Sequence, residues 1–242
     1  MEKDISRFLR SLSFAITFIA LLWMVQGIEH WSTSNLGRFG NLPRTLNGAV
    51  GIITGPLIHG DFSHLLSNTF PLLLLIGGLF YFYPRIAFEV FFWIYVMSGF
   101  WVWMSAREAY HIGASGLIYG LISFLLFNGL FRKDSISITI SLVIVFLYGS
   151  MLYGLFPSGG KVSWESHFFG ALAGLILAFY FRRDNIKEGP LEISPKPEKE
   201  SDEIIEKINT VDCSVKGMDY KYVLMGGKIK KKKKGNVDSK EG

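Results

Sequence analysis

The chain has 242 residues, of which 50% are hydrophobic and 15% aromatic, and its mean hydropathy is +0.32. Its 25 basic and 20 acidic residues gather at the start, in short loops and after residue 181. This composition is typical of an integral membrane protein. The single cysteine, Cys213, excludes a disulfide within the chain, and no thiol enzyme is indicated because the residue lies in a polar segment without nearby histidines.

Six apolar runs are long enough to cross about 30 Å of hydrocarbon. They cover residues 11–28, 64–83, 86–104, 112–131, 136–156 and 164–181. The first run lacks a small-x-small cleavage site and is longer than a signal-peptide core, so we predict a retained helix. The predicted fold is therefore all-α, a polytopic bundle of six transmembrane helices.

Polar segments flank and interrupt this membrane domain, which we place at 11–181. Residues 1–10 form a short N-terminus, and residues 182–242 read as a linker and a weakly structured, lysine-rich tail, with a short helix expected over 202–209. The first outer loop, 29–63, contains too many glycines and prolines for another crossing, although 46–58 is apolar enough to lie at the membrane interface.

Basic residues predict the orientation, since cytoplasmic loops carry the excess of lysine and arginine. One side has Lys3, Arg7, Arg10, Arg85, Arg132, Lys133, Arg182 and Arg183, and the other has Arg38, Arg44, Arg107 and Lys161. Both termini are therefore expected in the cytoplasm. The run Lys228 and Lys230 to Lys234 is either solvated or in contact with anionic lipid head groups; without an aromatic platform it does not indicate nucleic-acid binding.

Four polar groups are predicted at one depth of the outer leaflet. The second span begins with His64 and Asn68, the fourth has Ser115 near its start, and the sixth has His167 near its start. Polar side chains inside a membrane are costly and usually face the bundle interior. These four side chains are therefore expected to converge.

Small residues predict which helices meet. His167 is followed by Gly170 and Gly174, and Ser115 by Gly116 and Gly120. Such small-xxx-small faces let helix backbones approach closely. If the two faces pack together, Ser115 and His167 come within side-chain reach.

That pair has the chemistry of a nucleophile and its base. A serine hydroxyl is a weak nucleophile until a neighbouring base takes its proton, and histidine titrates near neutrality. No Asp or Glu lies inside the apolar part of the fourth or sixth span to orient the histidine, although we place Glu165 just outside it, so we predict a dyad rather than a triad. Asn68, His64 and the Ser115 backbone N–H can donate to an oxyanion, with Gly113 shaping the backbone that presents it.

Other interpretations remain open at this point. A single serine or histidine in a membrane helix often makes only an interhelical hydrogen bond worth about 1 kcal/mol. His111 is a rival base, although Gly113 favours a loop position for it. A small transporter or channel would also gather polar groups, but the inner halves of these spans are almost purely apolar. No metal or cofactor is expected.

The combined motifs resemble those of the rhomboid intramembrane serine proteases. The matching residues are Gly113-Ala114-Ser115-Gly116, His167 with Gly170 and Gly174, His64 with Asn68, the earlier His59, and Tyr119 one turn after the serine. The resemblance covers about 29 to 181 and implies a Ser115–His167 dyad that cleaves other membrane proteins at or near their transmembrane segments, in a bacterial cytoplasmic membrane. It also implies that Tyr119 packs against the histidine.

The resemblance carries further expectations and one departure. It implies that the fifth span, 136–156, which lacks small-xxx-small faces, is a lateral gate, and that the loop 157–163 caps the serine. Many family members have a Trp-Arg pair in the first outer loop, where this chain reads Asn41-Leu-Pro-Arg44. The alternative function is a catalytically silent relative that governs the trafficking or degradation of membrane proteins, but such relatives typically lose the serine or the histidine.

Overall fold

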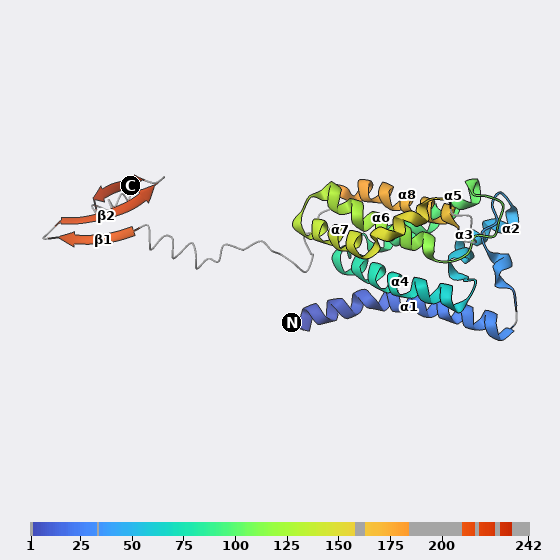
Figure 1. Ribbon diagram of the computed structural model, residues 1–242. Coiled ribbons are helices and arrows are strands. Elements are labelled where there is room, and N and C mark those ends of the chain that lie inside the picture. The colour runs from blue at the N-terminus through green and yellow to red at the C-terminus, as the bar shows by residue number, and fades with distance from the viewer. Residues whose placement is uncertain are drawn as a thin grey trace, which may run out of the picture. The chain divides into compact units, whose positions relative to one another are not determined.

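The computed structural model describes residues 2–32, 34–157, 163–183, 210–215, 218–225 and 228–233. The chain divides into two compact units, Met1–Leu191 and Glu192–Gly242. The first unit is helical (Figure 1). The second contains a small sheet.

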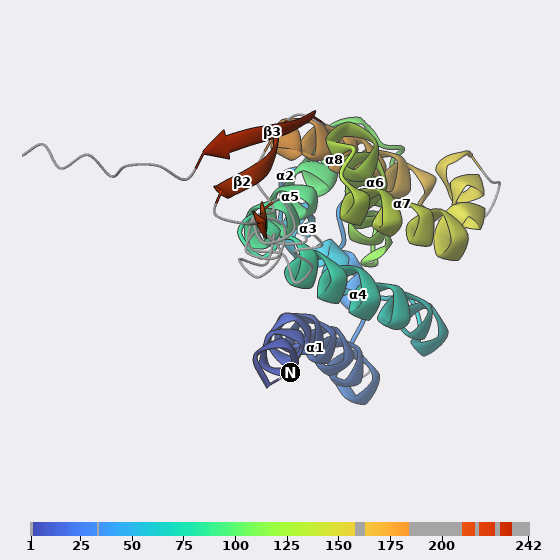
Figure 2. The same cartoon turned by 90° about the vertical axis from the view of Figure 1, so that its left-hand side faces the viewer.

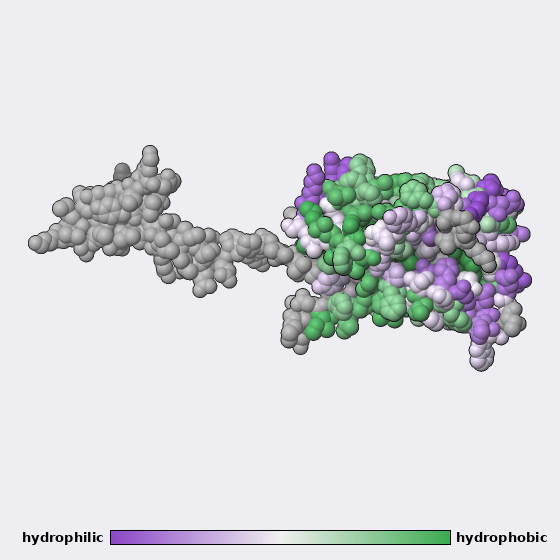
Figure 3. Space-filling model, viewed as in Figure 1, coloured by the Kyte–Doolittle hydropathy of each residue, from purple (hydrophilic) through white to green (hydrophobic). Residues whose placement is uncertain are grey.

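Six helices of the first unit are long and apolar enough to cross a membrane, within the described residues, which confirms the predicted fold class. They are α1 (Glu2–Ser32), α4 (Phe62–Phe82), α5 (Ala87–Ser105), α6 (Ser115–Arg132), α7 (Ser135–Tyr148) with the 3-10 segment η3 (Gly149–Leu155), and α8 (Trp164–Tyr180) with η4 (Phe181–Arg183). The visible face of this unit is largely hydrophobic over the middle of the helices, and hydrophilic residues gather at its two ends, one of them near α2 (Figure 3). The fourth span begins at Ser115 rather than at residue 112, because Gly113 has a φ of +105° that no helix accommodates.

Helix α6 is the centre of the bundle. It packs against α4, α5, α7 and α8, and most of its residues are buried. Helix α1 lies at the edge of the unit against α4 (Figure 2). The residues of α6 therefore face protein on nearly every side, which is why polar groups can be placed there.

Glycines bring α6 and α8 into backbone contact. A Cβ at Gly170 would overlap the carbonyl of Gly116, and a Cβ at Gly174 would overlap that of Gly120. The predicted packing of the two small-residue faces is therefore present. It sets the separation of Ser115 and His167, which lie at the same end of these two helices.

Serines pack the N-terminal half of α7, called the inner half after the predicted orientation, against α6. Ser141 Oγ donates to the Leu126 carbonyl at 2.7 Å, and a Cβ at Gly129 would overlap Ser141 Oγ and the Ser137 carbonyl. The expectation that this span lacks a small-xxx-small face was wrong, because Ser137 and Ser141 provide one. The inner half of α6 also buries Asn128 completely.

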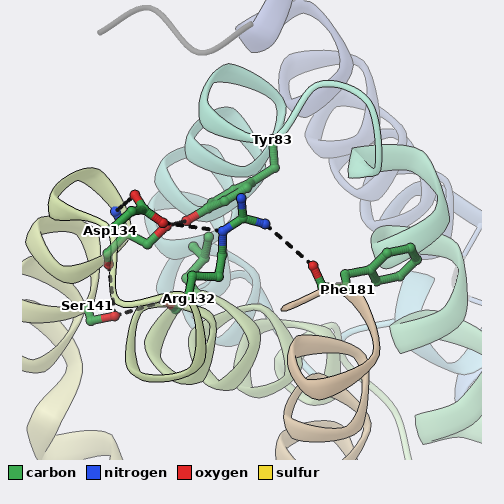
Figure 4. A network of polar contacts seen from close by, with 7 residues as sticks. Tyr83, Arg132, Asp134, Ser141 and Phe181 are labelled. Carbon is green, nitrogen blue, oxygen red and sulfur yellow. Dashed lines mark hydrogen bonds and ion pairs between the residues drawn. The ribbon is translucent and has the colours of Figure 1, made fainter. Parts of the chain in front are cut away.

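A polar cluster closes this inner end (Figure 4). Tyr83 Oη donates to Ser137 Oγ at 3.1 Å, and Arg132 pairs with Asp134 at 3.3 Å. Arg132 Nη1 also donates to the Phe181 carbonyl at 3.4 Å. The end of α4, the α6–α7 turn and the end of α8 are thus joined.

The first outer loop folds into short helical turns: η1 (Leu36–Phe39), α2 (Leu46–Ala49), α3 (Gly51–Thr54) and η2 (Gly55–Leu57). Leu46, Val50 and Ile53 remain exposed, as expected of an interfacial segment. Arg44 Nη1 donates to the Ala106 carbonyl, and Trp103 Nε1 donates to the Thr45 carbonyl. A tryptophan of α5 therefore packs beside Arg44, although the loop itself lacks the Trp-Arg pair.

The second unit contains three antiparallel strands in the order β1–β2–β3: β1 (Thr210–Val215), β2 (Met218–Met225) and β3 (Lys228–Lys233). Cys213 is opposite Tyr220, and Leu224 is opposite Ile229. The structure differs here from the weakly structured tail expected above. The short helix expected over 202–209 lies outside the described residues.

Candidate active site

Ser115 is the first residue of α6, directly after a sharp backbone turn. Gly113 has positive φ, and a Cβ there would lie 2.8 Å from His64 Cε1, so both the conformation and the contact require glycine. The first N–H groups of a helix lack intrahelical acceptors and carry its positive dipole end. The backbone N–H of Ser115 is therefore well placed to stabilise a negative charge beside its own hydroxyl.

His167, in the first turns of α8, contacts Ser115 across the helix interface. The distance from His167 Nε2 to Ser115 Oγ is 2.9 Å, and His167 Nδ1 is 2.9 Å from the carbonyl oxygen of Gly154. A carbonyl oxygen accepts only, so in the neutral ring Nδ1 carries the hydrogen and Nε2 accepts from the serine hydroxyl. The serine is therefore hydrogen-bonded to a basic nitrogen.

Tyr119 fixes the plane of the His167 ring. The two rings are stacked with centroids 4.1 Å apart and an interplanar angle of 10°. Tyr119 Oη donates to the Met151 carbonyl at 2.8 Å. The histidine is thus held on one face by a ring that is itself hydrogen-bonded.

His64, near the start of α4, has its ring against Gly113, and Asn68 lies one turn further along the same helix. The carboxylate of Asp61 caps α4 by accepting from the His64 N–H at 2.7 Å. Asn68 is buried, and its Nδ2 donates to the His64 carbonyl at 3.0 Å. An amide nitrogen has two N–H groups, so this bond occupies one donor of Asn68.

Comparison with known protein families identifies the family to which this chain belongs. The sequence model of the Rhomboid domain matches residues 47–184, more than half of the chain. The chain belongs to the rhomboid family. The match includes every polar residue that the sequence predicted for the site, from His59 to His167.

Curated relatives of this rhomboid are bacterial. A protein of Mycobacterium bovis named as uncharacterised is 39% identical over 178 residues, which cover 68% of this chain and 72% of the relative. An uncharacterised Mycobacterium leprae protein is 34% identical over 176 residues, 68% of each chain. A Bacillus subtilis protein, YdcA, described provisionally as a rhomboid protease, is 29% identical over 178 residues, 69% of this chain and 86% of the relative. This rhomboid is thus a multi-pass membrane protein of a family whose members are generally intramembrane serine proteases.

His59 supports the turn that carries the serine of this rhomboid. Its Nε2 accepts the Ala114 N–H at 3.3 Å, and its ring meets that of His64 edge to face, with centroids 5.1 Å apart. Burial, together with the neighbouring His64, lowers the pKa of His59 from 6.5 to about 4. His59 is therefore neutral at physiological pH and can keep accepting from Ala114.

Acidification should consequently weaken the fold through His59. Between pH 6.5 and about 4 the unfolded chain binds a proton at this residue that the folded chain does not, so its contribution is complete above pH 6.5 and declines as the pH falls through that window. The shift corresponds to roughly 3 kcal/mol. Thermal unfolding in detergent from pH 8 to pH 4 should show a steeper loss of stability for the wild type than for His59→Gln, which retains an acceptor and does not titrate. Parallel curves for the two proteins would contradict this assignment.

A second polar group holds the outer start of α8. Glu165 is buried in the first turn of this helix rather than outside it, and pairs with Arg107 Nε at 3.3 Å. His111 lies outside α6 and contacts Ser163, so the structure brings His167, not His111, to the serine. Burial lowers the pKa of His111, although its bond to the Arg107 carbonyl and the nearby Glu165 act in the opposite sense.

Two contributors to the site carried no recognisable sequence signal. Gly154 and Met151 act through backbone carbonyls, which every residue has, so only the close approach at Gly154 distinguishes either position. The remaining supporting residues, Gly116, Gly170 and Gly174, act through helix packing. Most of the cap expected at 157–163, including Gly159 and Gly160, lies outside the described residues.

Proposed function

We propose that this rhomboid is an intramembrane serine endopeptidase with Ser115 as nucleophile and His167 as general base. The observation that carries the proposal is the 2.9 Å contact between His167 Nε2 and Ser115 Oγ, with the opposite ring nitrogen bonded to a carbonyl. This geometry suits transfer of the hydroxyl proton to Nε2, because a neutral histidine can accept a proton there. The Gly154 carbonyl occupies the place that a carboxylate has in a triad.

The chemistry follows from these positions. Ser115 Oγ attacks the scissile carbonyl carbon while its proton moves to His167 Nε2. The oxyanion receives hydrogen bonds from the Ser115 N–H and from His64 and Asn68, where each preorganised donor contributes roughly 3 kcal/mol. The C–N bond then breaks as Nε2 protonates the amine, and a water, deprotonated by the same nitrogen, hydrolyses the acyl-serine.

The substrate class is proposed from the location of the site. Ser115 and His167 lie at the ends of membrane-spanning helices, so they can reach peptide bonds in or near the transmembrane segments of other proteins. With both termini in the cytoplasm, as the basic residues predict, the serine lies in the outer leaflet. Helix α7 is the proposed side of substrate entry, and the lysines of 228–234 are a proposed contact for anionic lipids.

The silent-relative alternative gains no support from the site. Such a protein needs no contact between the serine and a histidine, yet here the two side chains are in hydrogen-bond contact. A transport pathway is likewise not favoured, because polar groups of the inner half, such as Ser141 and Tyr83, bond to neighbouring helices.

A fluorophosphonate probe, which reacts with activated serines, tests the proposal. The wild type in proteoliposomes should be labelled and should cleave a single-span test substrate, and Ser115→Ala should do neither. Ser123→Ala, which changes another buried serine of α6, is the matched control and should retain both activities. Labelling that persists in Ser115→Ala, or a folded wild type that neither reacts nor cleaves, would refute the proposal.

A further inference from the structure

The segment η3, which follows α7, contacts both His167 and Tyr119, the ring that stacks on it. Its Met151 carbonyl accepts from Tyr119 Oη at 2.8 Å, and its Gly154 carbonyl is 2.9 Å from His167 Nδ1. Tyr119 in turn stacks on His167. One short segment thus holds the ring plane and one edge of the same imidazole.

The bond to Gly154 decides which ring nitrogen is basic. A neutral imidazole carries one hydrogen, and the nitrogen without it is the acceptor. Facing a carbonyl oxygen, Nδ1 must hold the hydrogen, which leaves the lone pair of Nε2 directed at Ser115 Oγ. In the opposite tautomer two lone pairs would meet at Gly154, and Nε2 would have no capacity to take the serine proton.

Residue 154 is a glycine for a local reason. A Cβ there would overlap Tyr119 Oη and would lie 3.2 Å from His167 Nδ1. Gly149, at the other end of η3, has nothing within 4 Å of such a Cβ. The close approach of the backbone to the histidine therefore depends on Gly154 and not on glycine content in the segment.

The two ends of the fifth span are held very differently. The inner half of α7 is secured by Ser141 and by the Tyr83–Ser137 bond (Figure 4). Beyond Ile144 most large apolar side chains are exposed, with Phe146 at 87% and Tyr153 at 83%, while Tyr148 and Met151 pack against the core. In the described part of the chain, the side-chain hydrogen bonds of this outer half are those that the η3 carbonyls make with Tyr119 and His167.

We propose that Gly154 is a positioning residue, and that its carbonyl, presented by η3, holds His167 in the tautomer and orientation that the serine needs. The Gly154 carbonyl selects the tautomer with a basic Nε2. The inference rests on the proposed function for its catalytic consequence, but the hydrogen bond itself is testable independently.

Paired glycine variants measure the catalytic part. Gly154→Ala should lower kcat by about a hundredfold with little change in KM, the loss expected when a reacting group is displaced by about 1 Å. Gly149→Ala should remain close to the wild type. Adding Tyr119→Phe to Gly154→Ala removes the atom that the new Cβ overlaps, and should restore part of the lost kcat. Equal losses of kcat and of thermal stability in both single variants would indicate a structural role and overturn the proposal.

The tautomer is observed directly by 15N NMR of histidine-labelled protein, with the His167 signals assigned by their absence from His167→Ala. The wild type and Gly149→Ala should show a protonated Nδ1 and an unprotonated Nε2, and Gly154→Ala should show a mixture. An unchanged His167 spectrum in Gly154→Ala would overturn the proposal. If the wild type is inert toward the fluorophosphonate probe, the proposed protease function fails, whereas the NMR comparison still decides whether Gly154 sets the tautomer.

Discussion

Replacing His167 by alanine is expected to lower the rate of substrate cleavage by at least roughly a thousandfold. The serine would then have no base within reach, and removal of one member of such a unit costs most of its catalytic power. Initial cleavage rates of a single-span substrate in proteoliposomes measure the effect.

The matched control for this variant is His30→Ala, which changes an exposed histidine of α1 and should leave the rate unchanged. Size-exclusion profiles and thermal unfolding should show that His167→Ala remains folded. A folded His167→Ala protein that cleaves at a rate within a few-fold of the wild type would exclude His167 as the base.

Gly170→Ala is expected to separate α6 from α8 and to lose about a hundredfold or more in kcat. The new Cβ would overlap the Gly116 carbonyl, which is backbone and cannot rotate away, so the helices must shift. A displacement of about 1 Å between reacting groups is enough for a loss of this size. Thermal stability should fall as well, because close backbone packing is a main source of helix association in membranes.

Gly78→Ala provides the comparison, because this glycine lies in α4 with nothing within 4 Å of an added Cβ. It should affect neither kcat nor stability. Gly174→Ala should behave like Gly170→Ala, since its Cβ would overlap the Gly120 carbonyl. Wild-type activity in both Gly170→Ala and Gly174→Ala would show that the α6–α8 contact does not control the site.

The membrane spans were predictable because each is a long apolar run with at most one charged residue, a signal that depends on length and composition alone. The ends of the spans were less predictable. The fourth helix starts at Ser115 because of the positive φ of Gly113, a backbone property that composition does not reveal. The strands of the second unit were missed, although Gly226-Gly227 between two of them in the sequence is typical of a hairpin.

The contact between Ser115 and His167 was predictable because glycine spacing indicates which helix faces meet. The same reasoning missed the α6–α7 interface, where serines take the part of the small residues: Ser137 and Ser141 also form a small-xxx-small face. The pairing of Trp103 with the Arg44 region was not predictable, because the acceptors at Thr45 and Ala106 are backbone carbonyls, which every residue has. The contact of the Gly154 carbonyl could not be predicted either, because every residue has a backbone carbonyl.

The close contact between Gly129 of α6 and Ser141 of α7 has a geometric consequence at the other end of the fifth span. This contact fixes the position of α7 on α6. The residues between Ser141 and Gly154 therefore determine the axial position and the rotation at which the Gly154 carbonyl oxygen faces His167. Each residue of α7 adds about 1.5 Å of length and about 100° of rotation, and each residue of the 3-10 segment η3 adds about 2.0 Å and about 120°. The number of residues between the two points is thus as constrained as their identities, although the N-terminal half of α7 does not touch the reacting atoms.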